Sequence, residues 1–230
     1  MILSVHQPQY IPWLGYFDKI AKSDCFVFLD DVQYKPREYQ NRNKIRTSTG
    51  DTWLTVPVIS KGLGRQKISD VAIDNELDWC KQHLMSIKSC YGHAEFFGDY
   101  FPFFENTYAQ EWEKLSDLNL RIINFVLKEL AVTTPLYFES KLDIIKTKTD
   151  RIIEICKKMN ADTYLSGSGG RKYLEEGKFS EAGIKLIYQE YAHPVYRQLF
   201  MNKNSDFIPH MSIIDLLFNE GRGSLKILKI

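Results

Sequence analysis

The amino-acid sequence predicts an α/β fold built on a parallel sheet of Rossmann-like topology. Two observations predict it. Apolar, helical and again apolar patterns follow one another over residues 2–5, 14–22 and 25–29, and a strand–helix–strand unit of this kind pairs its strands in parallel. Strand patterns return near the end of the chain, after a mostly helical region over about residues 75–160. Because both ends carry strands and polar loops, we expect one domain over residues 1–230, with the helical region inserted in it.

Each element of the first unit follows from its residue pattern. Ile2 to Val5 is apolar but too short for a helix, so we expect a buried strand. Pro8 and Pro12 then prevent a regular element from continuing. Leu14 to Lys22 places its apolar residues at helical spacing. Cys25 to Leu29 is uninterrupted and apolar, which is typical of a central strand buried on both faces.

The later elements are predicted from the same periodicities. Helical spacing is found at 79–90, 112–130, 150–159 and 213–218, and strand patterns at 53–58, 71–73, 163–165 and 184–188. The polar stretch 32–51 is expected to be a loop, and the aromatic cluster at 96–104 is expected to pack the helices together.

The composition limits the possible functions. The 230 residues are 44% hydrophobic and 26% charged, as in ordinary globular proteins. A net charge of +1 provides no strong basic field, which argues against DNA as a partner. The N-terminus has no leader pattern and no apolar stretch approaches about 18 residues, so we expect a cytoplasmic chain without a membrane span. The four cysteines form no C-x-x-C pair and are expected to be reduced.

The first candidate site follows the first strand. In an open parallel sheet, ligands bind beyond the carboxyl ends of the strands. The strand at 2–5 delivers His6 and Gln7 to that edge, and Gly15, beside Tyr16, allows close backbone approach where the helix begins. The alternative for His6 is a hydrogen-bonded loop histidine without a functional role.

The second candidate site follows the second strand. Asp30 and Asp31 repel each other and require cations, a metal or donors nearby. Arg42 and Lys44 are such cations, or they bind substrate phosphates. A solvated loop with ordinary turns is the alternative, but we favour a function because the polar stretch directly follows an apolar strand. The candidate substrate-binding residues here are Gln33, Tyr34, Asn41, Arg42 and Lys44.

Metal binding has little support in the sequence. The histidines lack the H-x-x-x-H and H-x-H spacings of metal sites, so no resident metal is predicted. A Mg²⁺ ion held by substrate phosphates and by Asp30 or Asp31 is the alternative.

The third candidate site is a glycine- and serine-rich loop between a strand and a helical pattern. Its N–H groups can surround an anion, with Arg171 or Lys172 completing the charge. The loop lacks the P-loop spacing. A flexible turn is the alternative, but three glycines and two serines between ordered elements favour phosphate binding. The candidate cofactor-binding residues of the loop are Ser166, Gly167, Ser168, Gly169, Gly170 and Lys172.

The fourth candidate site follows the last strand. It gathers His193, Tyr196 and Gln198 in one polar, aromatic loop. His193 is a candidate acid–base group because the pKa of a histidine is easily tuned near neutral pH; the alternative is a packed residue before a proline. Asp215, near the start of the last helix, is expected to be structural.

These stretches together resemble the WbqC-like protein family. The matching pieces, in family order along the whole chain, are V-H-Q-P-Q-Y-I-P-W-L-G-Y-F, L-D-D-V-Q-Y, N-R-N-K-I, Y-L-S-G-S-G-G-R-K-Y-L, H-P-V-Y-R-Q and S-I-I-D-L-L-F-N-E-G. The resemblance implies an enzyme of bacterial O-antigen or related surface-polysaccharide biosynthesis, with glycine transfer as one role.

A more distant resemblance is to the HIGH-type nucleotidyltransferases and pantothenate synthetase. Residues 13–16 fall where that fold has its H-x-G-H loop, with the glycine retained and both histidines replaced, by Trp13 and Tyr16. Residues 168–174 are similar to the late phosphate loop of pantothenate synthetases, one residue shorter. The resemblance implies a nucleotide-binding site.

The leading hypothesis is an ATP-using acyl or aminoacyl transferase that forms an amide on an amino sugar. The loop at 166–172 binds the phosphates; His6, Gln7, Gly15 and Tyr16 contact the reacting phosphate and adenosine; Asp31, Gln33, Asn41 and Arg42 orient the acceptor; and His193 deprotonates the amine. The candidate catalytic residues are His6, Asp31, Arg171 and His193, and Tyr196 and Gln198 are further substrate-binding candidates.

Two alternatives remain open: a transferase using a preactivated nucleotide sugar or charged tRNA, and a non-catalytic sugar-binding or assembly protein. All the enzymatic schemes require His6 and Arg171 to lie on the same rim of one sheet.

Overall fold

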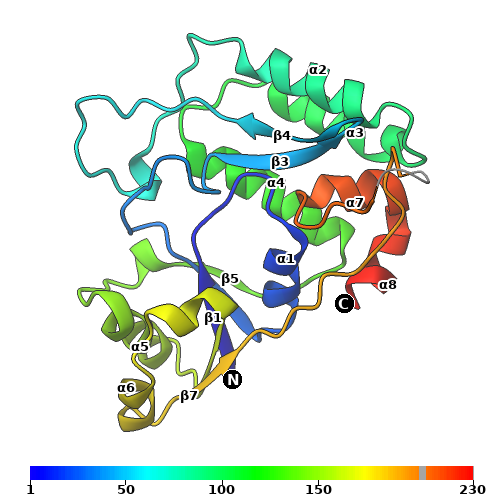
Figure 1. Cartoon of the computed structure of the whole chain (residues 1–230). Helices are drawn as coiled ribbons and strands as arrows, with labels where there is room; N and C mark the ends of the chain where they lie inside the picture. Colours follow the sequence, from blue (N-terminus) through cyan, green and yellow to red (C-terminus); the bar gives the residue numbers. More distant parts are fainter. Residues whose placement is uncertain (202–205, 230) are drawn as a thin grey trace.

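The computed structural model describes residues 1–201 and 206–229. Its centre is a five-stranded sheet in the order β5-β2-β1-β6-β7, and every neighbouring pair is parallel (Figure 1). The strands are β1 (Ile2–His6), β2 (Cys25–Phe28), β5 (Leu136–Phe138), β6 (Thr163–Ser166) and β7 (Lys185–Tyr188). Helices flank the sheet, so the predicted α/β class and Rossmann-like topology are confirmed.

The strand order reverses at β1. From β1 the chain adds β2 and then β5 on one side, and it later returns to place β6 and β7 on the other side of β1. Loops leaving neighbouring strands on the two sides of such a point run in opposite directions and leave a crevice between them. The fold therefore directs a binding crevice to the carboxyl ends of β1 and β6.

The two faces of the central sheet pack against different helices. Side chains alternate between faces along a strand, and Leu3, Val5 and Val27 pack with α5 (Lys148–Lys158) and α6 (Glu176–Glu181) in one apolar cluster. Phe26 and Phe28 point to the opposite face and join the larger cluster that contains α1 (Leu14–Ala21).

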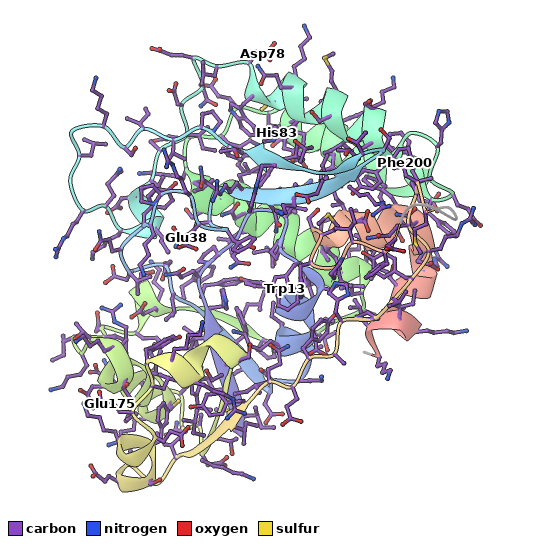
Figure 2. All side chains as sticks on the ribbon, in the orientation of Figure 1. Trp13, Glu38, Asp78, His83, Glu175 and Phe200 are labelled. Carbon is purple, nitrogen blue, oxygen red and sulfur yellow. The ribbon has the colours of Figure 1, made fainter. Side chains whose placement is uncertain are left out.

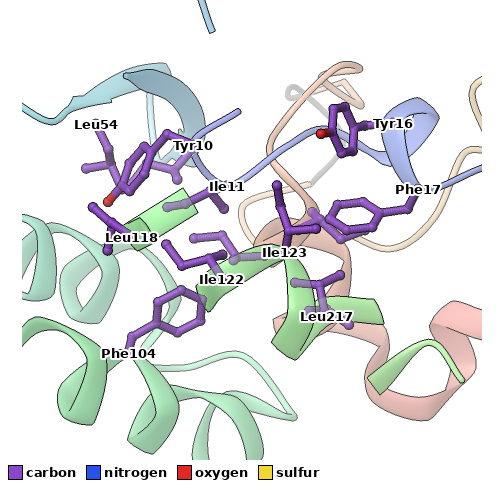
Figure 3. Close-up of a cluster of buried hydrophobic side chains, with 14 of the residues drawn as sticks. Tyr10, Ile11, Tyr16, Phe17, Leu54, Phe104, Leu118, Ile122, Ile123 and Leu217 are labelled. Carbon is purple, nitrogen blue, oxygen red and sulfur yellow. The ribbon is translucent and has the colours of Figure 1, made fainter. Parts of the chain in front are cut away.

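A second layer lies over this larger cluster. It consists of the antiparallel hairpin of β3 (Arg42–Thr47) and β4 (Gly50–Thr55) together with helices α2 (Trp79–Tyr91), α3 (Phe97–Tyr108), α4 (Leu115–Glu129), α7 (Ile213–Glu220) and α8 (Ser224–Leu228) (Figure 1). Helix α4 joins the layers because Leu118, Ile122 and Ile123 are fully buried among side chains of α1, the loop before it, β4, α3 and α7 (Figure 3).

Short 3₁₀ turns complete the described chain. They are η1 (Ile68–Asp70), η2 (Glu139–Lys141), η3 (Ser168–Lys172) and η4 (Gly221–Gly223). No helix within residues 1–201 and 206–229 is long and apolar enough to cross a membrane.

The structure corrects several predicted elements. The stretch 32–51, predicted as a loop, contains β3, whose buried positions include Asn43 and Arg46; polar residues there hid the strand pattern. The strand predicted at 53–58 begins at Gly50 and ends at Thr55. In the strand predicted at 71–73, only Ala72 and Ile73 form isolated bridges. The aromatic cluster is itself helix α3, which continues through Pro102.

Candidate functional site

A cavity of about 470 Å³ opens at the carboxyl edge of the central sheet, where the strand order reverses. The ends of β1 and β6 and the turn that follows β6 supply much of its wall, and α1, α5 and the loop after β2 supply further lining residues. Its lining residues are Val5, His6, Gln7, Lys19, Leu29, Lys35, Ile152, Tyr164, Ser166, Gly167, Gly169, Gly170 and Tyr173. Loops from the two ends of the chain thus meet in one cavity.

The glycine- and serine-rich loop forms one wall as the tight turn η3. The Gly170 N–H donates to the Gly167 carbonyl at 2.9 Å, and the Leu174 N–H donates to the Gly170 carbonyl at 2.9 Å. A side chain at Gly170 would collide with Ser166 Oγ, whereas one at Gly169 would meet open space. Gly170 is therefore required for the turn to close on β6, and Gly169 leaves the backbone accessible to a ligand.

Lys19 reaches the cavity from α1. Its side chain is buried, with only 3% of the residue exposed, and Nζ donates to the Val5 carbonyl at 3.0 Å. The neighbouring carboxylate of Asp18 pairs with Lys22 instead, at 2.7 Å. Across the described residues, no carboxylate lies within ion-pair distance of Lys19. Burial lowers the pKa of this amine to about 7.

His6 and Gln7 form the floor at the end of β1. Burial, and secondly the positive charge of Lys19, lower the pKa of His6 to about 3, so its imidazole is neutral at physiological pH. Its Nδ1 lies 3.2 Å from the Gln7 carbonyl oxygen, a distance that suits donation from that nitrogen. The Gln7 side chain accepts a hydrogen bond from Gln40 Nε2 at 2.7 Å.

That contact ties the loop between β2 and β3 to the cavity. Gln40 Oε1 in turn accepts the Lys35 N–H at 3.0 Å, which holds Lys35 at the cavity wall. In Figure 2 the label of Glu38 shows where this loop lies, between the hairpin and the central sheet. The loop therefore adds a second cation to the lining.

Gly15 and Tyr16 do not line the cavity but support it. The indole of Trp13 lies against Gly15 and leaves no room for a side chain there. The buried Tyr16 hydroxyl donates to the Gln7 carbonyl at 3.1 Å. Gly15 thus allows approach of Trp13 rather than of a ligand.

Arg171 and Lys172 lie on the same turn as the glycines, on the rim that carries His6, but outside the cavity lining. Both are exposed, and the Arg171 guanidinium stacks over the Tyr188 ring at 4.0 Å. Ser168, at the start of the turn, also lies outside the lining.

The acidic pair after β2 is satisfied within the chain. Asp30 accepts the Ser140 N–H at 2.9 Å and the Ser140 hydroxyl at 2.5 Å, and Asp31 pairs with Lys67 at 2.5 Å. The backbone of Gln33 forms an isolated antiparallel β-bridge with that of Lys67, and the backbone N–H of the buried Tyr34 donates to the Gln66 carbonyl. None of these acidic or polar side chains lines the cavity.

The described part of the chain contains no group of three or more His, Cys, Asp or Glu residues placed to hold a metal ion. The cavity lining itself includes no acidic side chain.

The candidates on β3 and beside it belong to the hairpin. The buried Asn41 amide donates to the Val56 carbonyl at 2.8 Å. The Arg42 guanidinium stacks over Trp53 at 4.3 Å, and Lys44 pairs with Asp51 at 2.8 Å. These residues lie outside the cavity lining.

The fourth candidate site is also committed to internal contacts. His193 Nδ1 lies 2.8 Å from the Pro194 carbonyl oxygen, and Nε2 accepts the His210 N–H at 3.1 Å. Burial lowers the pKa of His193. Tyr196 and Gln198 each donate to the buried carboxylate of Asp215 at 2.7 Å, and neither lines the cavity.

The sequence analysis missed four cavity residues with clear chemical character: Lys19, Lys35, Tyr164 and Tyr173. Lys19 had the best signal, because it is a cation one turn after Gly15 in a helix between two buried strands. Tyr173, an exposed aromatic residue, directly follows the basic end of η3. The resulting lining is cationic or neutral throughout, a composition that suits an anion.

Comparisons with known proteins give one family. The model of the WbqC-like protein family matches residues 7–227. The chain is 38% identical over 221 residues to the uncharacterized protein Rv1507c of Mycobacterium tuberculosis (strain ATCC 25618 / H37Rv), covering 95% of this chain and 94% of that protein. No solved structure matches. Apart from Val5 and His6 at the end of β1, the residues of the site lie between the ends of this match. The chain belongs to the WbqC-like protein family.

Proposed function

We propose that the chain is an enzyme that binds a nucleotide by its phosphates in the cavity and transfers an acyl or aminoacyl group, such as glycine, to an amino sugar of a bacterial surface polysaccharide of the O-antigen type. The observation that carries the proposal is the cavity where the strand order reverses, lined by a glycine turn and two lysines and by no acidic side chain. Nucleotides bind open α/β sheets at this kind of position.

The cavity has the features that a phosphate ligand requires. Gly167 and Gly169 expose backbone at a turn whose first N–H groups lack partners within the turn. Lys19 and Lys35 supply positive charge, and neutral His6, whose Nδ1–H is directed at the Gln7 carbonyl, keeps Nε2 as an acceptor for a hydroxyl or amine of the ligand. A volume of about 470 Å³ lies within the usual range of small-molecule sites.

The remaining lining suits the rest of such a ligand. Leu29 and Ile152 provide apolar surface, and Tyr173, a residue that is 67% exposed, presents its ring at the wall. An exposed aromatic face can stack on a nucleobase or on the apolar face of a sugar. Both components are present in a nucleotide and in the sugar acceptor.

In the proposed reaction ATP supplies the activation of a carboxylate, and an amide, AMP and pyrophosphate are the products. The chain contributes by holding the phosphates with fixed N–H groups and cations, which stabilise charge where it develops. His193 has both ring nitrogens engaged within the chain, so we assign proton transfer to groups of the cavity instead. The lining offers Mg²⁺ no carboxylate, so a metal would bind mainly through the phosphates, and no step is assigned to it.

Release of pyrophosphate from ATP tests the proposal. The purified chain is incubated with ATP, each amino acid and a set of nucleotide-linked amino sugars; we expect release that requires both an amino acid and a sugar. His6→Ala should abolish it, and His93→Ala, at an exposed position outside the cavity, should leave it unchanged. Absence of ATP consumption with every pairing would remove the activation step.

Thermal shifts separate this proposal from a transferase that uses a preactivated donor. A ligand stabilises the folded state in proportion to the logarithm of its concentration over Kd. ATP should raise the Tm more than nucleotide sugars do if the nucleotide cavity serves activation. The reverse order favours the preactivated donor.

A further inference from the structure

We propose that Lys19 is the charge partner of the bound phosphate and that its amine takes up a proton when the phosphate binds. The inference rests on the phosphate site of the proposed function and adds a residue and a proton to it. The observation behind it is a lysine amine buried at a cavity without a carboxylate partner among the described residues.

The geometry leaves the amine ready for a ligand. A lysine ammonium has three N–H donors, and the Val5 carbonyl, at 3.0 Å, is the one acceptor found for it in the described structure. A side chain added at Gly167 would place its first carbon 4.0 Å from Nζ, so the amine lies directly beside the glycine turn. An anion against that turn is within reach of the two remaining donors.

The surroundings of Lys19 offer its amine the Val5 carbonyl and the face of the Phe26 ring, 6.0 Å from Nζ, but no anion within ion-pair distance among the described residues. From the other elements, the groups that share the cavity with it are His6 of β1, Lys35 of the following loop, Tyr164 of β6 and Tyr173 after η3. Each of these is neutral or cationic at neutral pH.

The one carboxylate on the helix of Lys19, that of Asp18, is directed to other partners. Asp18 is occupied by Lys22, at 2.7 Å, and by Gln189, whose Nε2 donates to it at 2.6 Å. The buried Tyr16 keeps its proton because burial raises its pKa well above the usual value. A bound phosphate would therefore be the first anion that the amine meets.

The direction of the proton movement follows from these contacts. Burial lowers the pKa of Lys19 to about 7 in the empty cavity. A phosphate oxygen beside the amine favours the charged form and raises that pKa toward its ordinary value of roughly 10.4. Binding between these two pH values consequently takes up a proton, and affinity falls by up to about tenfold for each pH unit above 7.

The experiment is titration calorimetry of the whole chain with ATP and, separately, with inorganic pyrophosphate. Runs at pH 8 in two buffers with different ionisation enthalpies measure the protons taken up. With a pKa of about 7 in the empty cavity, the wild-type chain should take up about 0.9 proton through Lys19. Repeating the titration at higher pH gives the predicted loss of affinity.

Three variants identify the amine responsible. Lys19→Met should weaken binding at least about thirtyfold and remove the proton uptake, and it should raise the Tm of the empty protein because a buried unpaired amine is replaced by an apolar chain of similar size. Lys19→Arg keeps a permanent charge, so any binding that it retains should proceed without proton uptake. Lys128→Met, at an exposed position of α4 outside the cavity lining, should keep the wild-type uptake.

The outcomes separate the inference from the proposed function. Wild-type binding without proton uptake, together with unchanged affinity in Lys19→Met, overturns the role of Lys19 and leaves the nucleotide site standing. Proton-linked binding of pyrophosphate without any binding of ATP supports Lys19 and overturns the nucleotide function. A folded chain that binds neither probe overturns both.

Discussion

The cavity and the second layer contain the same kinds of polar side chain but use them differently. In the second layer, the buried Asp215 carboxylate accepts hydrogen bonds from Tyr91, Tyr196 and Gln198. In the cavity, the Lys19 amine has one carbonyl acceptor, and the open side of the glycine turn faces solvent. Histidine, glutamine and tyrosine occur in both places, so residue type alone does not identify the site.

The difference shows what a candidate site requires. A buried polar group that is fully hydrogen bonded within the chain rigidifies the fold, whereas one left with open donors at a cavity can be completed by a ligand. Substitutions in the second layer should therefore change stability, and those in the cavity should change binding. The predictions below test this division from the largest expected effect to the smallest.

Asp215→Ala should give the largest loss of stability. It strands three buried donors at once, and removing one partner of a buried charged network costs about 3–5 kcal/mol. Urea denaturation measures the change in the free energy of unfolding. Asp215→Asn, which keeps the shape and one acceptor, should lose less. An unchanged unfolding midpoint in Asp215→Ala would contradict the structural role.

Acid should destabilise the second layer through His83. This ring contacts the buried Tyr10 hydroxyl at 2.7 Å, and burial lowers the pKa of His83 to about 4. The unfolded chain binds the proton at a pKa of about 6.5, so the unfolded state holds more protons between these values. Stability should then fall as pH drops from about 6.5 to 4, by up to about 1.4 kcal/mol per pH unit.

The control for this prediction is the difference between two variants. Unfolding of His83→Gln should lose part of the acid dependence, because the titrating ring is gone. The exposed His93→Gln should retain all of it. If the free energy of unfolding fell equally steeply with falling pH in the two variants, the acid effect would belong to groups other than His83.

The central sheet was the part of the fold that the sequence predicted best. The apolar runs before His6 and after Asp24 and the helical spacing from Leu14 each carry a strong periodicity because these elements are buried on well-defined faces. Strand β3 was not predicted because polar residues replace the usual alternation of apolar and polar side chains, at Arg42, Asn43, Lys44 and Arg46. The three-residue edge strand β5 is too short to show any period.

The sequence predicted the position of the site's backbone loops better than it predicted which charged side chains line the cavity. Strand ends and glycines placed His6 and the turn at 166–170 on one rim, as the fold requires. Whether Asp31 or Tyr196 is available depends on Lys67 and Asp215, partners far away in the chain, which no local pattern reveals. Lys19 was missed for the converse reason: a helical lysine is ordinarily exposed.

Gly170→Ala should damage the cavity wall. The added methyl group collides with Ser166 Oγ, so the turn must shift, at a cost of about 1–3 kcal/mol in stability and with weaker pyrophosphate binding. Gly169→Ala meets open space and is the matched control. Adding Ser166→Ala to Gly170→Ala removes the colliding hydroxyl and should restore part of the stability. A double variant as unstable as the sum of the single ones would contradict this packing.

The smallest and most direct comparison exchanges two histidines for alanine. His6→Ala removes the Nε2 acceptor from the cavity and should weaken ATP binding about tenfold, the effect of about one hydrogen bond to a ligand hydroxyl or amine, with little change in the unfolding midpoint. His193→Ala removes the acceptor of the His210 N–H and should cost about 1 kcal/mol of stability with unchanged binding.

Calorimetry measures the affinity of each variant, and urea denaturation measures its free energy of unfolding. We expect His6→Ala to lose affinity and keep stability, and His193→Ala to lose stability and keep affinity. If His193→Ala weakened binding while the fold kept its stability, the segment at 191–198 would belong to the site, and the division between the two regions would fail. A stability loss in His6→Ala without a binding change would equally make His6 a packed loop residue. The expected result would place the chemistry in the cavity, because only there would removing a side chain reduce the binding affinity more than the stability of the fold.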